Sequence, residues 1–320
     1  MYLKDKRGSA VLKTGLVATV VLGSAVFGGW FLPAAAQKDV PPEIVPYLRA
    51  RSVIDYSVAE LIESMPELKN LDFAPTQEPL APILKKLGEN AEAFFDSYPN
   101  TSALEDVFFE REEPGGVVDQ YHKLKFYYII TAHNSEDELG LEEYRTTLKD
   151  ERINLSDLKG AYLLTSGHAS ASLHFHPRLS YGCKFRYLGR EKKKPQAHVI
   201  AFSQNPEKTR TWGMINLLGN EAAILKQGAV WVDPGSYQIL RMRSDLLGPR
   251  SDVGLEQHTS IIDFSEFRFD GLSRTLWLPR EVRLVIKFKG WKFTNQHRYS
   301  QYRLFTVSSI DGPKRIKKNP

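Results

Sequence analysis

The chain has 320 residues, of which 42% are hydrophobic and 25% are charged, as in a soluble globular protein with a sizeable core. Its net charge is +5, but the excess lies at the two ends of the chain. Residues 1–36 hold four basic residues and one acidic residue, so the remainder carries 39 basic and 37 acidic residues. The four basic residues of Lys314–Lys318 account for more than that difference. Between these two ends the chain has almost no net charge, which argues against nucleic-acid binding.

The N-terminus has the three-part pattern of a secretory signal peptide. Lys4, Lys6, Arg7 and Lys13 precede the apolar run Gly15–Leu32, which is followed by Pro33 and three alanines. We predict that residues 1–36 are a signal peptide cleaved after Ala36, which places the protein in the periplasm or outside the cell. The alternative is an uncleaved inner-membrane signal anchor, because the apolar run approaches the length that spans a bilayer. After cleavage we expect no membrane span.

Residues 37–100 are predicted to form a linker and helices. Ser57 and Glu60 have the spacing of a capping box, which predicts a short helix that Pro66 ends. A longer helix is predicted from Pro79 to before Pro99. Its apolar residues follow helical spacing and define one face: Leu80, Ile83, Leu84, Leu87, Ala91, Phe94 and Phe95. This face either packs on the β part as core or serves as a lid over a binding groove.

Residues 101–310 are predicted to form an antiparallel β domain, and residues 311–320 a basic tail. β-branched and aromatic residues with a period near two predict the strands 103–111, 117–131, 140–148, 183–188 and 198–204. The segments 212–215 and 221–226 precede the stretch from Gly228. The acidic segment 135–138 is predicted to be a loop, and 154–159 a turn or short helix. The period-two pattern indicates an α+β fold in which the sheet dominates.

The stretch Gly228–Val307 shows the strongest strand pattern. Asp233-Pro234-Gly235 predicts the turn of a hairpin, with Leu240 and Met242 on one face of the returning strand. In Glu281–Lys289 apolar residues alternate with charged ones, which predicts a sheet with one wet and one apolar face. Large residues on both faces mark a last strand at 299–307.

The single cysteine, Cys183, excludes an internal disulfide. It lies in a predicted strand, where we expect a half-buried, unreactive thiol rather than a nucleophile. The motifs of zinc proteases, α/β-hydrolases, P-loops and dinucleotide-binding proteins are absent from the sequence. We expect no catalytic residue, no metal and no cofactor.

Three histidines are the basis of the one alternative in which the protein is an enzyme. His168, His174 and His176 are close in sequence, and the last two share a face if the segment is a strand. A hydrolase or a metal-dependent enzyme would need them to meet carboxylates through the fold. The acidic runs at Glu142-Glu143 and 110–113 are expected to be solvated instead.

Two resemblances bear on the fold. Trp231-Val-Asp233-Pro234, followed by Leu240-Arg-Met242, resembles the hairpin of the LolA/LolB-like lipoprotein-carrier half-barrels. Residues 57–307 also resemble an uncharacterised group of exported bacterial proteins, through Phe185–Arg190, Leu276–Glu281 and Tyr299–Tyr302. The carrier resemblance implies a strongly curved antiparallel sheet, an incomplete barrel, whose apolar concave face holds acyl chains beneath helices packed on it.

These observations predict an exported, non-enzymatic protein that binds a lipid or other hydrophobic ligand in a half-barrel groove. The residues expected to line that groove or its core are Trp231, Leu240, Met242, Leu284, Ile286 and Phe288. The alternative is an envelope protein that binds another protein, with the sheet interior filled as core. The hydrolase or metal enzyme at the three histidines is the second alternative.

Overall fold

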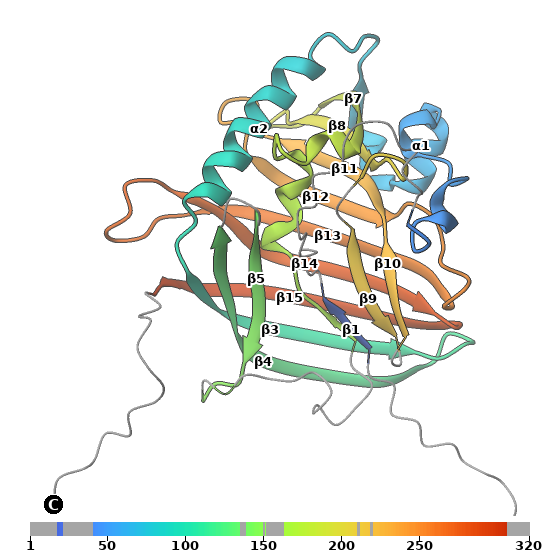
Figure 1. The fold of residues 1–320 in the computed structure, drawn as a ribbon, viewed down its shortest axis with the longest axis vertical. Helices are drawn as coiled ribbons and strands as arrows, with labels where there is room; N and C mark the ends of the chain where they lie inside the picture. The colour runs from blue at the N-terminus through green and yellow to red at the C-terminus, as the bar shows by residue number, and fades with distance from the viewer. Residues whose placement is uncertain are drawn as a thin grey trace, which may run out of the picture.

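The computed structural model describes residues 18–21, 41–134, 139–149, 151, 163–209, 212–217 and 220–305. An eleven-stranded sheet dominates the fold, and each strand in it is antiparallel to its neighbours (Figure 1). In spatial order its strands are β2 (Leu71–Phe73), β7 (Cys183–Glu191), β8 (His198–Gln204), β11 (Lys226–Val232), β12 (Ile239–Leu246), β13 (Leu255–Phe267), β14 (Leu276–Phe288), β15 (Trp291–Leu304), β3 (Thr101–Glu112), β4 (Val118–Asn134) and β5 (Leu139–Thr146). Within the described residues β2 and β5 do not pair, so the sheet stays open. The predicted incomplete antiparallel barrel is confirmed.

Two helices flank this sheet, as the sequence predicts. Helix α1 (Val58–Ser64) begins at the capping box of Ser57 and Glu60 and ends before Pro66. Helix α2 (Leu80–Asp96) begins after Pro79 and lies across the inner face of the sheet. The segment between the helices also supplies the edge strand β2, which the sequence pattern does not predict.

A second, four-stranded sheet covers the other end of the inner face (Figure 1). Its order is β10 (Asn220–Ile224), β9 (Gly213–Leu217), β1 (Ala18–Val21) and β6 (Leu163–Thr165). Strand β1 pairs with β9 antiparallel and with β6 parallel. It lies within the predicted signal peptide, whose cleavage site lies outside the described residues. The predicted loop 135–138, the turn 154–159 and the basic tail also lie outside them.

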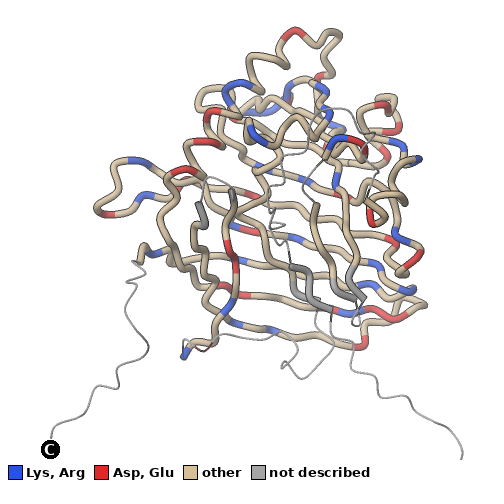
Figure 2. Tube along the Cα trace, viewed as in Figure 1, with Lys and Arg blue, Asp and Glu red and all other residues tan. Residues whose placement is uncertain are grey.

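The inner face carries two apolar clusters. The inner core gathers side chains of the sheet beneath α2, among them Tyr128, Ile200, Phe202, Val230, Met242, Ile262 and Val282. The second core lies beneath β9 and β10 and includes Val107, Phe109, Ile215, Ile224, Leu284, Ile286 and Phe288. The alternation predicted for Glu281–Lys289 is confirmed, because Val282, Leu284, Ile286 and Phe288 are all buried on this face. Lys and Arg are interspersed with Asp and Glu over the described part of the chain (Figure 2).

Gly189 shows why a glycine is needed where β2 joins the sheet. Its φ of +137° is one that L side chains rarely adopt, and a Cβ there would lie 1.9 Å from the backbone oxygen of Asp72. Gly189 pairs with Phe73, so any side chain would displace β2 from β7.

We therefore predict that Gly189→Ala lowers the free energy of unfolding by at least about 2 kcal/mol, through backbone strain and overlap. Gly235→Ala is the matched control, because a Cβ there meets its nearest atom at an ordinary 3.4 Å, and it should change stability by less than about 1 kcal/mol. Urea unfolding of both variants measures the difference. Equal stabilities would contradict the steric explanation.

Candidate functional site

The candidate site is the apolar inner face of the sheet where α2 covers it. The helix is amphipathic, and its buried residues are Ile83, Leu87, Gly88, Ala91 and Phe95. Ile83, Leu87 and Phe95 belong to the inner core, together with residues of β4, β8, β11, β12, β13 and β14. The 3-10 helix η5 (Ala169–Phe175) packs beside α2 and contributes Phe175 to the same core. The inner face is therefore filled by the protein's own side chains.

Polar contacts hold α2 at two places on the rim of the sheet. The Asn90 amide donates to the carbonyl oxygens of Ser236 and Tyr237, both at 2.9 Å, in the β11–β12 turn. The Arg274 guanidinium, in the β13–β14 turn, donates to the carbonyl oxygen of Ala93 at 2.6 Å and to that of Ser97. Arg274 thus serves carbonyls at the C-terminal end of the helix, where backbone partners run out, and the Ser97 hydroxyl also donates to the Ala93 carbonyl at 2.9 Å.

A narrow apolar slot remains between α2 and the sheet. Its volume is about 30 Å³, room for a single water molecule. The residues that line it are Leu87, Asn90, Ala91, Phe94, Ser172, Tyr237, Gln238, Ile239, Phe264 and Trp277. The slot marks the seam along which α2 meets β12, β13 and β14.

A buried polar cluster lies between the inner core and the second core. Glu105 of β3 accepts two hydrogen bonds from the Arg145 guanidinium, at 2.6 and 2.8 Å. It also accepts from Tyr299 at 2.9 Å and lies 2.8 Å from His297 Nδ1. Neither Glu105 nor His297 is accessible to solvent. Three groups from β5 and β15 therefore satisfy the buried Glu105 carboxylate inside the sheet, while His297 Nε2 has no hydrogen-bond partner among the described residues.

The pKa values of this cluster follow from its burial and its charges. Burial alone would raise the pKa of Glu105, but Arg145 and His297 outweigh burial and hold that pKa below the ordinary value. Burial lowers the pKa of His297, although Glu105 opposes the shift. The pKa of His168, whose ring lies 5.3 Å from that of His297, is lowered well below its ordinary value, again mainly by burial.

Glu143 corrects one expectation from the sequence. It was expected on a solvated face, but it is only partly exposed and points toward η5. Its carboxylate accepts hydrogen bonds from the Tyr128 hydroxyl, from the backbone N–H groups of Ala169 and Ser170, and from the Ser170 hydroxyl. Glu143 therefore holds the start of η5 against β5.

The three histidines do not meet. His168 Nε2 is 3.3 Å from the Thr165 hydroxyl, whereas the His174 ring stacks on Phe202 and the His176 ring lies edge-on to Phe95. His174 and His176 share no strand face, because the segment forms η5 rather than a strand. Among the described residues, no group of three His, Cys, Asp or Glu side chains is arranged to hold a metal ion. Cys183 is half-buried as expected, and burial raises its pKa to about 12.

The six residues predicted to line the groove fall into three clusters. Met242 lies in the inner core, and Leu284, Ile286 and Phe288 lie in the second core. Trp231 is on the outer face of the sheet with Leu240 packed against its cluster, beneath α1. Leu240 and Met242 were expected to share a face, which is wrong. The pairing shifts so that Val232 pairs with Ile239 while Trp231 pairs with Arg241, and this β-bulge at Leu240 reverses the alternation.

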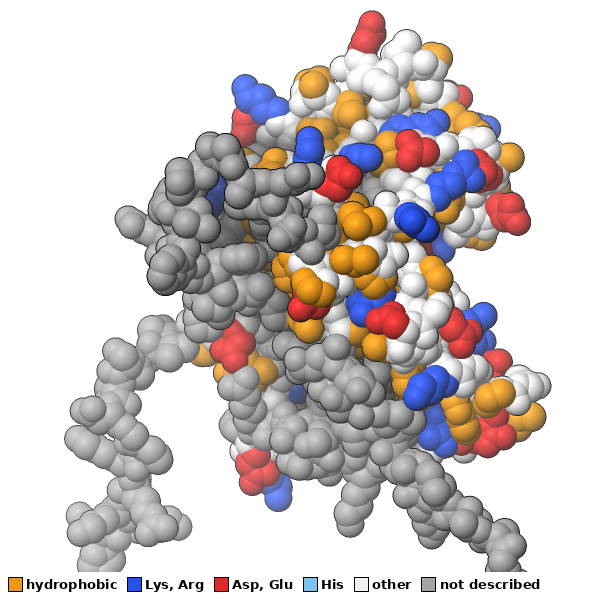
Figure 3. Space-filling view, turned by 45° about the vertical axis from the view of Figure 1, so that its right-hand side comes forward, with side chains coloured by type: hydrophobic (Ala, Val, Ile, Leu, Met, Phe, Trp, Pro, Cys, Tyr) orange, Lys and Arg blue, Asp and Glu red, His pale blue; other side chains and the backbone are white. Residues whose placement is uncertain are grey.

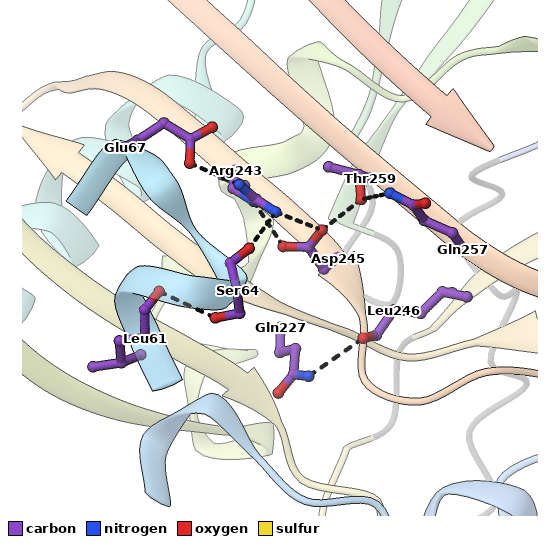
Figure 4. Close-up of polar contacts among 9 residues, drawn as sticks. All are labelled: Leu61, Ser64, Glu67, Gln227, Arg243, Asp245, Leu246, Gln257 and Thr259. Carbon is purple, nitrogen blue, oxygen red and sulfur yellow. Dashed lines mark hydrogen bonds and ion pairs between the residues drawn. The ribbon is translucent and has the colours of Figure 1, made fainter. Parts of the chain in front are cut away.

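The outer face carries a second, more polar hollow of about 350 Å³ between α1 and β11–β13. Figure 4 shows Arg243 at its wall, donating to Glu67 at 2.7 Å, to the Ser64 carbonyl at 2.8 Å and to Asp245 at 2.9 Å. Asp245 also accepts from the Thr259 hydroxyl at 2.6 Å. These contacts fasten the N-terminal helices to the sheet. Figure 3 shows hydrophobic side chains gathered near the middle of one face of the molecule, bordered by charged ones.

Comparison with known proteins gives a distant structural likeness. No protein-family model matches the chain, and no curated protein matches it. A solved domain described as an outer membrane lipoprotein-sorting protein, from Vibrio parahaemolyticus, is 11% identical, with a TM-score of 0.35 over 71% of this chain and 93% of that one. A DUF1329 family protein from Desulfovibrio piger is 12% identical, with a TM-score of 0.35 over 72% and 95% of the two chains. At this level of similarity neither structure transfers a property or a site residue to this chain.

We predict that Glu105→Gln lowers the free energy of unfolding by about 3–5 kcal/mol, because it leaves Arg145 buried without its counter-charge. Since the pKa of Glu105 is depressed in the folded state, its contribution is present above the unfolded value of about 4.3 and is lost as the pH falls below it. The difference between variant and wild type should therefore narrow on acidification. Asp106→Asn on the same strand is the control, because Asp106 pairs with Lys125 at the surface and should cost less than about 1 kcal/mol. A Glu105→Gln variant as stable as Asp106→Asn would contradict the prediction.

Proposed function

We propose that this chain is an exported, non-enzymatic protein that binds a lipid or another hydrophobic ligand on the inner face of its sheet, with α2 as a displaceable cover. The observation that carries the proposal is the way α2 is held. An amphipathic helix closes the apolar face, and polar contacts at Asn90 and Arg274 join it to two rim turns of the sheet.

Exchange of helix for ligand involves a hydrophobic cost, a compensating gain and the loss of the rim hydrogen bonds. When α2 lifts, the apolar side chains beneath it lose their cover, at about 25 cal/mol for each Å² exposed. An acyl chain laid on the same face restores that burial. The remaining cost is the loss of the Asn90 and Arg274 hydrogen bonds, about 1–3 kcal/mol each for a charged donor and less for the amide. The slot along α2, lined by Phe94, Phe264 and Trp277, offers the seam for entry.

Of the predicted lining residues, Met242 lies directly beneath α2 and is proposed to contact the ligand. Leu284, Ile286 and Phe288 continue the same face beneath β9 and β10 and would be reached by a longer chain. Trp231 and Leu240 lie on the outer face, where they pack against α1 and the segment around it.

Export follows from the signal peptide predicted for residues 1–36. No helix among the described residues is both long and apolar enough to cross a membrane. Cleavage after Ala36 would also remove strand β1 and leave β9 paired with β10 alone in that sheet. The mass of the exported protein tests the cleavage: a mature chain starting at Gln37 supports it, and an intact N-terminus supports the anchor instead.

We predict that Arg274→Ala combined with Asn90→Ala increases the affinity for the uncharged dye N-phenylnaphthylamine about fivefold or more. Losing about 1 kcal/mol of closure raises the fraction of open protein by that factor. Arg268→Ala is the matched control, because Arg268 lies in the same turn, has 83% of its side chain exposed and pairs with Glu266. Dye fluorescence titration measures the affinities. If the double variant binds no better than the Arg268 variant, α2 is not a displaceable cover.

A second candidate function is protein binding in the cell envelope with the inner face as permanent core. The favouring observation is a hollow of about 470 Å³ on the outer face of β3, β4 and β5, where Leu104, Tyr127, Ile129 and Tyr144 contribute to the lining. Pull-down from envelope extracts with Tyr127→Glu as the control distinguishes this function. A partner that wild type retains and the variant loses supports it, and equal recovery contradicts it.

A further inference from the structure

Lys226 is a buried cation on the inner face of the sheet. It begins β11, where its neighbour Gln227 points outward and accepts a hydrogen bond from the Val53 N–H on the outer side. Strand alternation therefore turns Lys226 inward, and only 8% of the residue is exposed. Buried lysines are rare unless they are paired.

Four titratable groups from separate elements lie close enough to feel the charge of Lys226. They are Glu143 of β5, His168 before η5, His174 within η5 and His258 of β13. The hydrogen bonds of the described residues include none from Lys226 Nζ, and Glu143 is already engaged by Tyr128 and η5. Lys226 is thus a buried charge without a direct counter-ion in the described part of the chain.

His258 adds an independent observation. Its Nε2 atom is buried and has no hydrogen-bond partner, although the residue is only 3% exposed. The register places Leu246 opposite Lys226 on β12, two residues from the Ser244–Ser260 pair that joins β12 to β13. His258 lies two residues from Ser260 in the same direction, so it faces inward in the same cross-strand row as Lys226. A buried imidazole nitrogen without a partner is costly. His176 Nε2 and His297 Nε2 share this feature among the described residues, and His258 differs from them in lying close enough to feel the buried charge of Lys226.

A row of small residues connects this point to the space beneath α2. Gly228, Ser244 and Ser260 pair with one another across β11, β12 and β13, one step from Lys226 and His258. The following row, Val230, Met242 and Ile262, belongs to the inner core. His174 covers the small-residue row by stacking on Phe202, which pairs with Gly228. From Lys226 to Val232 the strand spans roughly 20 Å, at about 3.4 Å per residue, which suits a long chain.

We infer that Lys226 and His258 Nε2 bind the carboxylate head of a long-chain amphiphile, whose chain runs over Gly228, Ser244 and Ser260 to the apolar face beneath α2. The inference rests on the proposed function and names the class of ligand. A monoanion fits best, because one ammonium neutralises one charge and a dianion would leave a second charge buried without compensation.

The protonation states agree with this assignment. Burial lowers the pKa of Lys226 to about 8, so the ammonium form persists at neutral pH. Burial lowers the pKa of both His174 and His258 to about 3, so their imidazoles are neutral and His258 can donate one N–H. A bound carboxylate would raise the pKa of Lys226 toward its ordinary value.

The test compares hexadecanoate with hexadecanol, which differ in the charged head and share the chain length. Binding is measured by isothermal titration at pH 7 for wild type, Lys226→Met, Lys226→Gln and the control Lys287→Met, which removes an exposed lysine of β14. We expect wild type and Lys287→Met to bind hexadecanoate at least tenfold more tightly than hexadecanol. Lys226→Met should bind hexadecanoate and hexadecanol with equal affinity. In wild type the preference for hexadecanoate over hexadecanol should decline as the pH rises through about 8, because Lys226 then loses its proton.

The outcomes distinguish failure of this inference from failure of the proposed function. A Lys226→Met protein that keeps the preference for hexadecanoate overturns the inference. Equal binding of both compounds by wild type also overturns it and leaves the proposed function standing. Binding of neither compound overturns the proposed function as well. Lys226→Gln supplies the same comparison if the methionine variant fails to fold, which circular dichroism monitors.

Discussion

The structure depends on covering one apolar face of an open sheet. Eleven antiparallel strands carry the inner core and the second core on the same side of the sheet. Exposing either apolar cluster to water would be unfavourable. A closed barrel would bury such a face by itself, but β2 and β5 do not pair. The face therefore needs separate covers: α2 and η5 over one half, β9 and β10 over the other. A cover that is a separate element can be exchanged for something else, and the proposed function assigns this role to α2.

The polar cluster around Glu105 separates these two covered regions. Burying a carboxylate and a guanidinium is unfavourable unless each hydrogen-bonding group is satisfied. Glu105 meets this condition through Arg145, His297 and Tyr299, so it belongs to the architecture rather than to a binding site. Lys226 has no counter-ion in hydrogen-bond contact among the described residues, and His258 Nε2 has no hydrogen-bond partner there. His297 Nε2 of the Glu105 cluster is also unpartnered, so it is the uncompensated charge of Lys226 beside His258 that motivates the proposed ligand site.

Local sequence patterns predicted the elements that obey local rules. The capping box of Ser57 and Glu60, the start of α2 after Pro79 and the alternation from Val282 to Phe288 all follow from neighbouring residues, and all are confirmed. The bulge at Leu240 was not predicted from the sequence, because it arises from the pairing of Trp231 with Arg241 and not from the composition of the strand. The Glu105–His297 contact joins residues 192 positions apart, which no spacing rule reveals. Lys226 carried a weak signal, an isolated lysine at the start of a strand of otherwise buried residues, but only the register showed which face it takes.

The central claim is that the inner face beneath α2 holds a hydrophobic ligand. Native mass spectrometry of the exported protein, purified without detergent, tests it most directly, with lipid extraction of the same sample to identify the bound molecule. We expect a population whose mass exceeds that of the polypeptide by one amphiphile, and an extract containing that amphiphile. A single species at the mass of the bare polypeptide, with an extract free of lipid, would contradict the account and favour an inner face that is permanent core.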